Sequence, residues 1–482
     1  MMRETEDIVQ KSLDFLPLKS YANIREGNAL RLDWASVVPV EKLSYIMGNP
    51  PFVGYSLQTK SQKEDILSVF LDEKGKPTKT AGKLDYVSAW FYKAAQLISG
   101  TPTRAALVAT NSVCQGEQVA ALWKPLFEQF KIRLDFAYRT FRWDSDASDK
   151  AHVHCVIIGF SSEGESFPCI FTESGERVPA KNINPYLIDA PDVFVESRNK
   201  PICNVPEIIK GSSPVDGGNF FLEENERNEI ISAFPKAEKM IRRFLGAREF
   251  LHNLPRYCIW LEDTTPAEIK SVPAILKRVA AAKEFRLAST KAATRKFAEM
   301  PTRFMEMRQP KTNYILIPRH SSENRKYIPF GFMSPDVICG DANNMLPDAT
   351  IYHFGILTSS VHMAWVRVVC GRIKSDYRYS NDVVYNNFPW CEPTPEQRVK
   401  IEATAQAILD ARERYPDCSL ADLYDETTMP SDLRRAHRDN DRAVLAAYGF
   451  PKEITESQCV SLLMQRYNRG GETILSPRRK AP

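Results

Sequence analysis

The sequence predicts an α/β protein with a doubly wound sheet, followed by an α+β region and a small helical C-terminal region. Three observations support this fold class. Short apolar runs alternate with helical patterns between residues 43 and 160, as in βαβ units. A basic segment with mixed strand and helix patterns follows, and charged helical patterns dominate after residue 394. We therefore expect three domains in the 482-residue chain, over residues 1–200, 201–394 and 395–482.

Hydrophobic patterns mark the elements of the expected sheet. The segment 84–98 (LDYVSAWFYKAAQLI) is apolar nearly all round, so we expect a helix that packs against the sheet. In open sheets of this kind, ligands bind at the carboxyl ends of the strands. The other expected elements are a short strand within 23–34, a strand at 43–47, a loop or broken helix at 53–80, a strand at 104–110, a helix at 119–130 and strands at 132–138 and 153–160.

Helical patterns return in the second half of the chain. We expect one or two helices at 266–300 and a small bundle formed by helices at 395–415, 419–424 and 432–448, the last of which ends at Gly449. The tail at 468–482 contains two adjacent glycines and the run RRK, so we expect it to be disordered and able to touch nucleic acid nonspecifically.

The stretch Asn49-Pro50-Pro51-Phe52, directly after the expected strand at 43–47, carries the clearest sign of chemistry. The two prolines fix φ and lack a backbone N–H, so they end the strand, and Asn49 is held extended because it precedes a proline. The pattern predicts a rigid amide at the tip of a strand beside an aromatic ring. The alternative is an ordinary Pro-Pro turn in which Asn49 satisfies local backbone groups.

A rigid amide beside an aromatic ring suits methylation of an exocyclic amine on a nucleobase. The lone pair of such a nitrogen is delocalised into the ring, and it becomes nucleophilic when acceptors hold its hydrogens in a tetrahedral arrangement. Asn49 Oδ1 and the Pro50 carbonyl can supply two acceptors, and Phe52 can stack on a base flipped out of the duplex. This chemistry rests on positioning and preorganised dipoles rather than on a metal or a thiolate.

Composition narrows the class of protein. With 43% hydrophobic and 26% charged residues, and with no apolar run near the roughly 20 residues of a membrane span, the chain is expected to be cytoplasmic. Its ten cysteines never form C-x-x-C, so we expect neither disulfides nor a zinc site, and most should be buried. His152 and His154 alternate along an expected strand without ligand-spaced partners, so no metal is expected.

Positive charge is concentrated in the middle of the chain. Residues 241–330 contain 18 Lys and Arg against 8 Asp and Glu, although the whole chain carries a net charge of only +4. Such a segment is typical of a surface that meets phosphates, although a solvated helical face is the alternative. The expected phosphate contacts on the helices at 266–300 are Lys277, Arg278, Lys283 and Arg286, with Lys291, Arg295 and Lys296 beside them.

A series of segments resembles the motifs of amino-methyltransferases. Asn49-Pro50-Pro51-Phe52 resembles motif IV in the form typical of adenine-N6 enzymes. The resemblance implies S-adenosylmethionine as the cofactor, contacted by Asn28 and Ala29 of motif III and by Asp85 of motif V. It also implies that Phe52 and an aromatic of motif VIII sandwich the flipped base; Phe141 is favoured over Trp143 for this role. Thr110-Asn111-Ser112 resembles motif VI.

Further segments narrow the resemblance to the MmeI-like group of combined restriction and modification enzymes (types IIG and IIL). They lie at 210–221, 244–262, 317–332, 354–389 and 420–437, so the likeness covers nearly the whole chain. The resemblance implies a partial class I methyltransferase sheet, a target-recognition domain and a C-terminal helical region. It further implies site-specific methylation of adenine N6 in double-stranded DNA by base flipping, within a restriction-modification system.

Base reading needs side chains at groove edges. The polar run at 319–326 lies between two apolar segments and could present Arg319, Ser322, Arg325 and Lys326, although an ordinary surface loop is the alternative. A second candidate group is Arg372, Lys374, Tyr377 and Arg378.

One departure from the family pattern concerns the cofactor. The family binds S-adenosylmethionine with a glycine-rich loop upstream of motif III, yet the first glycine of this chain is Gly27. The chain thus resembles a C-terminal part of its family, in which a missing N-terminal region or a partner chain would supply motif I. The alternative function is a DNA-recognition fragment or subunit that is inactive alone. Methylation of protein glutamine or ribosomal RNA, where the Asn-Pro-Pro motif also occurs, is a third possibility.

Overall fold

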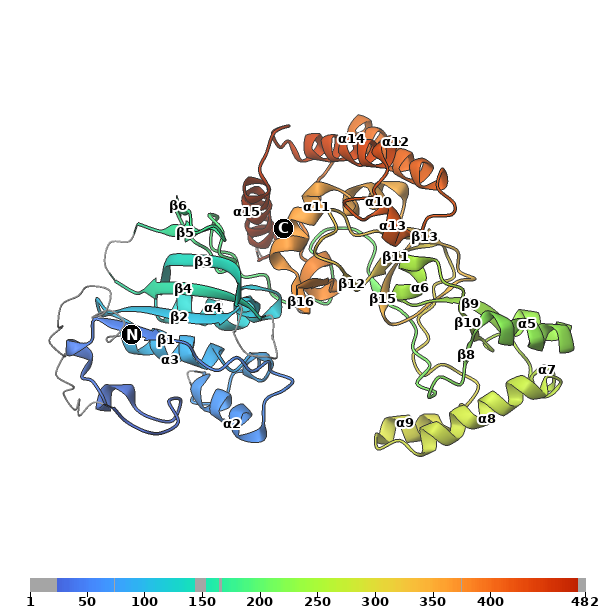
Figure 1. Cartoon of the computed structure of the whole chain (residues 1–482), viewed down its shortest axis with the longest axis horizontal. Helices are drawn as coiled ribbons and strands as arrows, with labels where there is room; N and C mark the ends of the chain where they lie inside the picture. The colour runs from blue at the N-terminus through green and yellow to red at the C-terminus, as the bar shows by residue number, and fades with distance from the viewer. Residues whose placement is uncertain (1–23, 73, 144–152, 164–166, 374, 476–482) are drawn as a thin grey trace, which may run out of the picture.

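The computed structural model describes residues 24–72, 74–143, 153–163, 167–373 and 375–475 (Figure 1). His152, Lys374 and the end of the tail at 476–482 therefore lie outside the described residues, as do the side chains of Arg142 and Trp143. No helix in the described part of the chain is long and apolar enough to cross a membrane.

The first domain is organised around a mixed sheet whose described strands run in the order β1-β2-β4-β3-β5-β6. β1 and β2 are parallel, and β4 lies antiparallel between β2 and β3. The mixed α/β architecture expected for this region is confirmed. The strands are β1 (Tyr45–Gly48), β2 (Arg104–Thr110), β3 (Arg133–Trp143), β4 (Val153–Ser161), β5 (Cys169–Phe171) and β6 (Arg177–Pro179).

Two helices cover one face of this sheet, α3 (Ser88–Ile98) and α4 (Glu117–Gln129) (Figure 1). Their aromatic side chains meet over β4, where Phe91 stacks on Phe160 at 5.7 Å and lies edge-on to Trp123 at 5.3 Å between ring centroids. A further helix, α2 (Lys60–Val69), begins at a capping box formed by Thr59. The short strand expected within 23–34 is wrong, because hydrogen bonds from Arg31 and Leu32 to the Asn28 carbonyl close a turn there, followed by the 3₁₀ turn η1 (Trp34–Ser36).

The middle region combines small sheets with short helices, as the sequence predicted. Among its described residues, two four-stranded sheets have the orders β14-β9-β10-β8 and β13-β11-β15-β7, and a three-stranded sheet has the order β12-β17-β16. The strands are β7 (Ile209–Lys210), β8 (Phe221–Leu222), β9 (Ile241–Leu245), β10 (Tyr257–Ile259), β11 (Tyr314–Pro318), β12 (His320–Ser321), β13 (Gly331–Met333), β14 (Ile338–Cys339), β15 (Asn343–Pro347), β16 (Gly371–Ile373) and β17 (Asp376–Arg378). The helices are α5 (Glu224–Ala233), α6 (Ala247–His252), α7 (Pro266–Lys270), α8 (Pro273–Leu287), α9 (Ala292–Phe297), α10 (Ile351–Leu357) and α11 (Ser360–Val369).

The C-terminal region is helical, as expected, with α12 (Pro395–Glu413), α13 (Leu420–Leu423), α14 (Ser431–Tyr448) and α15 (Glu456–Leu475). Gly449 ends α14 in the left-handed conformation at φ 68°, which confirms the predicted stop. The disorder expected from residue 468 is wrong as far as Leu475, because α15 continues through both glycines. α15 leaves the bundle and packs on α11 between the first and middle domains (Figure 1).

The first two domains are held together by close backbone contacts. The Gly116 N–H donates to the Val369 carbonyl at 3.2 Å, and a Cβ added to Gly116 would lie only 3.1 Å from Gly371 Cα. Asn387 Nδ2 donates to the Glu196 carbonyl at 2.9 Å. One hydrophobic core cluster runs through both domains and the C-terminal bundle. The strand ends of the first domain are therefore fixed relative to the three-stranded sheet β12-β17-β16.

Candidate active site

The Asn49-Pro50-Pro51-Phe52 loop starts where β1 ends, at Gly48. Asn49 and Pro51 are exposed, Pro50 is buried, and Phe52 is half-buried against the main core. A cavity of about 350 Å³ opens beside the loop and is lined by Asn49 to Pro51 together with the rings of Trp34 and Trp90. The amide of Asn49 thus lies at an open hollow at the strand tip rather than inside the core.

Three consecutive residues before α3 hold the segment that follows Phe52. The Tyr55 N–H donates to Asp85 Oδ1 at 2.9 Å, the Tyr86 N–H donates to the Val53 carbonyl at 2.9 Å, and Gln58 Nε2 donates to the Leu84 carbonyl at 2.8 Å. Both oxygens of Asp85 are used by the protein. Its Oδ2 accepts the Ser112 hydroxyl at 2.6 Å.

The turn that contains Asn28 and Ala29 is tied to α2 and α3. Asn28 Oδ1 accepts the Leu30 N–H at 2.9 Å and its Nδ2 donates to Asp65 at 2.9 Å. The Ala29 carbonyl accepts from Trp34 Nε1 at 2.7 Å and from Lys93 Nζ at 2.9 Å. Lys93 also donates to two further carbonyls of the turn and lies over the Trp34 ring.

Asp65 of α2 is a buried carboxylate that links this turn to Tyr86, just before α3. It accepts hydrogen bonds from Asn28, from Arg31 Nε at 2.7 Å and from the Tyr86 hydroxyl at 2.8 Å. Burial raises the pKa of Asp65, but these three hydrogen bonds outweigh it and leave that pKa below its usual value. Burial and the neighbouring carboxylate raise the pKa of Tyr86 to about 12.

Phe141 is half-buried on β3 and pairs with Cys155 of β4. β3 and β2 both run antiparallel to β4, so β3 points in the same direction as β1 and β2. Phe141, near the carboxyl end of β3, therefore lies at the same end of the sheet as Asn49, which follows the carboxyl end of β1. Its role opposite Phe52 stays a prediction.

The predicted phosphate contacts on α8 separate into exposed and internal cations. Lys277 and Lys283 are exposed. Arg278 pairs with Glu226 and donates to the carbonyls of Asn219 and Phe221, each at 3.1 Å. The expectation that Arg286 contacts DNA is wrong. Its side chain is fully buried and donates to the carbonyls of Pro214, Val215, Met300 and Arg303 at 2.7–3.0 Å.

The two candidate groups of base readers come together in one small sheet. β12 pairs with β17, with His320 opposite Arg378. Arg319, Ser322 and Arg325 are half-buried and Lys326 is exposed. Burial lowers the pKa of His320 and of Arg325. A hollow of about 420 Å³ is lined from this side by Arg319, Arg372 and Arg378, and from the first domain by Tyr55, Ser112 and Gln115.

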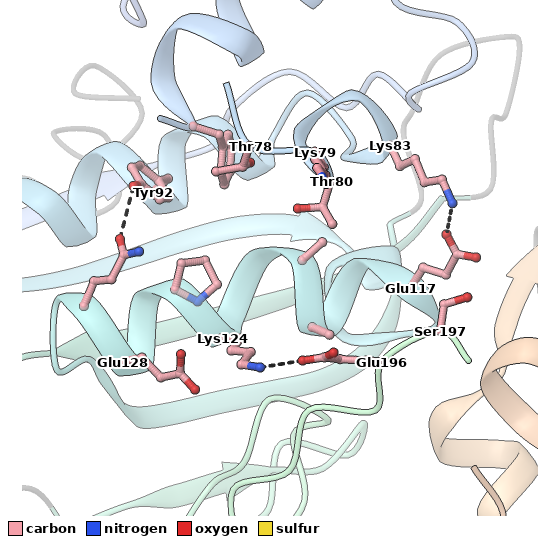
Figure 2. A pocket seen from close by; sticks show the side chains of 15 residues that line it. Thr78, Lys79, Thr80, Lys83, Tyr92, Glu117, Lys124, Glu128, Glu196 and Ser197 are labelled. Atoms are coloured by element: carbon pink, nitrogen blue, oxygen red, sulfur yellow. Dashed lines mark hydrogen bonds and ion pairs between the residues drawn. The ribbon is translucent and has the colours of Figure 1, made fainter. Parts of the chain in front are cut away.

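A further hollow of about 510 Å³ lies over α4, away from the Asn49 loop (Figure 2). Four of its charged side chains form two ion pairs, Lys83 with Glu117 at 2.9 Å and Lys124 with Glu196 at 2.5 Å. None of the catalytic or cofactor residues predicted from the sequence lines it.

Sequence reasoning missed four residues of the site, Trp34, Asp65, Trp90 and Lys93. Lys93 could have been found, because it is the only cation of its predicted apolar helix and therefore needs a polar partner. Eight of the ten cysteines are buried, as predicted.

Comparison with known proteins identifies the family. Three MmeI family models match the chain in succession: the DNA-methyltransferase domain over residues 1–172, the target recognition domain over 189–392 and the C-terminal domain over 393–475. The chain is 39% identical over 456 residues to "DNA methyltransferase A" of Bacillus subtilis (strain 168), an alignment that covers 94% of this chain and 51% of that protein.

A solved structure shows the same arrangement. The type IIL restriction-modification enzyme MmeI in complex with DNA superposes with a TM-score of 0.87 at 43% identity, and the match covers 98% of this chain and 63% of that one. This chain thus spans between half and two thirds of the length of these relatives. With methyltransferase, target recognition and C-terminal domains that match in order, the chain belongs to the MmeI family.

Proposed function

We propose that this chain carries the catalytic loop and the DNA reader of a site-specific DNA methyltransferase that methylates adenine N6 within a restriction-modification system. The observation that carries this proposal is the exposed Asn49 amide, at the tip of β1 beside an open cavity and at the same end of the domain as the β12-β17-β16 sheet. A flipped base enters from a duplex held between the two domains. The match to a DNA-bound relative supports double-stranded DNA as the partner.

In this proposal the chain acts on the amine by positioning it. Asn49 Oδ1 and the Pro50 carbonyl accept the two amine hydrogens, which turns the nitrogen lone pair toward the methyl donor, and Phe52 holds the plane of the base. Phe141 covers its other face. The acceptors are fixed before the substrate arrives, because Pro50 is buried and the loop is tied at Tyr55, so little reorganisation is needed.

S-adenosylmethionine, when bound, supplies the electrophilic methyl group. The cavity beside Asn49 fits this cofactor, because Trp34, Trp90 and Pro51 offer flat apolar surfaces for its adenine ring. Asn28 and Ala29 lie in the turn before η1, and the Ala29 carbonyl accepts the Trp34 indole N–H, which helps to hold that ring at the cavity wall. The Ala29 carbonyl already accepts two hydrogen bonds from the protein. Asn28 Oδ1 accepts only one, from the Leu30 N–H, so it is the better acceptor for a hydrogen bond from the cofactor.

DNA recognition divides between two surfaces. Lys277 and Lys283 on α8 contribute contacts to phosphates, which add affinity without sequence information. The β12-β17-β16 sheet, with Arg319 and Arg378 beside the hollow that faces Tyr55, is placed to read bases near the target adenine. Ser322, Arg325 and Lys326 extend the same run. We infer the boundaries of the three units as 1–200, 201–394 and 395–482.

The test is Asn49→Ala in a restriction-protection assay. We expect loss of methylation by at least about a hundredfold, since both acceptor geometry and charge stabilisation depend on this amide, while the Kd for the same DNA changes less than threefold. Glu128→Gln, an exposed carboxylate on α4, serves as the control. Near-normal protection by Asn49→Ala would refute the assignment.

A second candidate function is a DNA-recognition subunit that is active only with a further polypeptide. The exposed edge strand β1 favours this candidate. Among the described residues β1 pairs with β2 alone, and Tyr45 and Met47 on it are 67% and 80% exposed, whereas parallel strands are usually covered on both faces. A partner chain that pairs with this edge would also supply a glycine-rich loop. Micromolar binding of S-adenosylmethionine by this chain alone, measured by titration calorimetry, would contradict this candidate.

A further inference from the structure

We infer that Asp85 is a positioning residue for the catalytic loop rather than a contact to the cofactor. This inference rests on the proposed function and specifies which residues keep Asn49 and Phe52 in place. Its structural part concerns hydrogen bonds within the chain, so it can be tested without substrate or cofactor.

The segment after Phe52 lacks regular secondary structure until α2 begins at Lys60, so its position depends on individual hydrogen bonds. Residues 84–86 hold this segment in place through the hydrogen bonds to Gln58, Tyr55 and Val53 described above. Two of these hydrogen bonds use backbone groups of residues 84–86, the Leu84 carbonyl and the Tyr86 N–H. The bond from the Tyr55 N–H uses the Asp85 carboxylate and therefore has a charged acceptor, which makes it the strongest of the three.

Asp85 is itself held from several sides and is only 8% exposed. Its backbone N–H donates to Gln118 Oε1 at 3.0 Å, and its second oxygen accepts the Ser112 hydroxyl, which lies 2.7 Å from Thr110 Oγ1. A hydroxyl of a bound cofactor would have to compete with these protein donors in a site that is nearly closed to solvent. This arrangement is typical of a carboxylate that holds the protein structure rather than of one that binds a ligand.

The same network connects the catalytic loop to the reader. Ser112 belongs to the 3₁₀ turn η4 (Asn111–Cys114), and Gly116, just beyond it, is hydrogen-bonded to Val369 and lies against Gly371 at the start of β16. Asp85 thus bridges the loop that carries Asn49 and the segment that rests on the recognition domain. This explains how the methylated base keeps a fixed place relative to the bases that are read.

The experiment is hydrogen–deuterium exchange of the full chain, without ligands, in wild type, Asp85→Ala and Asp85→Asn. Asparagine keeps an acceptor for the Tyr55 N–H and can donate to Ser112, whereas alanine removes both contacts. We expect exchange in the peptide that contains Tyr55 to rise at least about tenfold in Asp85→Ala, as a charge-assisted hydrogen bond implies, and less than about threefold in Asp85→Asn. Exchange of β2 amides should be unchanged in both.

Two further measurements separate positioning from cofactor contact. Where the wild type binds S-adenosylmethionine, both variants should bind it within about twofold, and where it methylates DNA, Asp85→Ala should lower kcat at least tenfold with little change in KM for the cofactor. Unchanged exchange near Tyr55 in Asp85→Ala would overturn the inference, whether or not the chain methylates DNA. So would a tenfold loss of cofactor affinity without faster exchange.

Variants of Ser112 provide an independent check in case Asp85→Ala does not fold. Ser112→Ala removes the donor that fixes the second oxygen of Asp85, whereas Ser112→Thr retains a hydroxyl. We expect about threefold faster exchange near Tyr55 in the alanine variant and near wild-type exchange in the threonine variant. Equal exchange in these two variants would contradict the proposed role.

Discussion

Replacement of Lys93 by methionine tests how the turn beside the cavity at Asn49 is held. The Lys93 ammonium donates to the carbonyls of Ala29, Leu30 and Leu32, the first two at 2.9 and 3.0 Å. Methionine keeps an unbranched apolar stem of similar length, so the contact with the Trp34 ring is largely preserved. The substitution therefore removes the hydrogen bonds and little else.

The expected magnitude follows from the environment of those carbonyls. A hydrogen bond to a charged group contributes about 1.5–3 kcal/mol, but this turn is half-exposed and water can replace part of the loss. We therefore expect about 2 kcal/mol less stability for the closed turn, which is roughly a thirtyfold increase in its opening. The rest of the domain should keep its stability, because Lys93 is only half-buried and the buried residues of α3 are unchanged.

Hydrogen exchange at Arg31 and Leu32 measures this opening directly, because both amides donate to the Asn28 carbonyl inside the turn. Lys93→Arg, which retains a charged donor, should restore most of the protection, and Lys63→Met on the exposed side of α2 should have no effect. Exchange of the Tyr55 peptide should also stay at the wild-type level. Unchanged exchange at Arg31 and Leu32 in Lys93→Met would show that Lys93 does not hold this turn closed.

Three other predictions concern buried and exposed charges. Arg286→Met should lower the free energy of unfolding by more than about 3 kcal/mol in urea titrations, because four buried carbonyls lose their donor; a loss under 1 kcal/mol would contradict its structural role. Lys283→Gln should weaken DNA binding about threefold at low salt and reduce the slope of log K against log salt by about 0.9, with no change in unfolding. Because the pKa of Asp65 is depressed in the folded state, its contribution is fully present above the unfolded pKa of about 3.9 and is lost as pH falls through the folded value. The stability difference between wild type and Asp65→Asn should thus be larger at pH 6 than at pH 3.

Local patterns were sufficient for much of the catalytic domain. The predicted strand at 104–110 matches β2 residue for residue, because a buried apolar run there is bounded by polar residues at both ends. The end of β1 at the two prolines was also predicted, since proline cannot continue a strand. These features depend on neighbours in sequence, which a single chain displays.

Long-range partners account for what the sequence could not show. The side chain of Asn28 binds Asp65 and that of Asp85 binds Ser112, partners that lie 37 and 27 positions away in the sequence. No periodicity reveals such pairs. Trp34 and Trp90 were missed for a similar reason, because an aromatic in an apolar segment gives no sign that it faces a cavity.

Arg286 is an instructive error because its position did carry a signal. It follows Ile275, Val279 and Ala282 along one face of α8, and all three are buried. A cation at the end of an apolar stripe at helical spacing is more consistent with a buried structural arginine than with a phosphate contact. The prediction rested on the charge count of the whole segment, which treats every cation, including Arg286, as exposed.

The role of Asn49 is tested most directly by nucleoside mass spectrometry of DNA from cells that express either the wild-type chain or Asn49→Ala. We expect N6-methyladenine with the wild type and none with the variant, at equal protein levels. Methylated cytosine in place of methylated adenine, or equal N6-methyladenine in both samples, would contradict the claim that the Asn49 amide at the tip of β1 holds the amine of an extruded adenine.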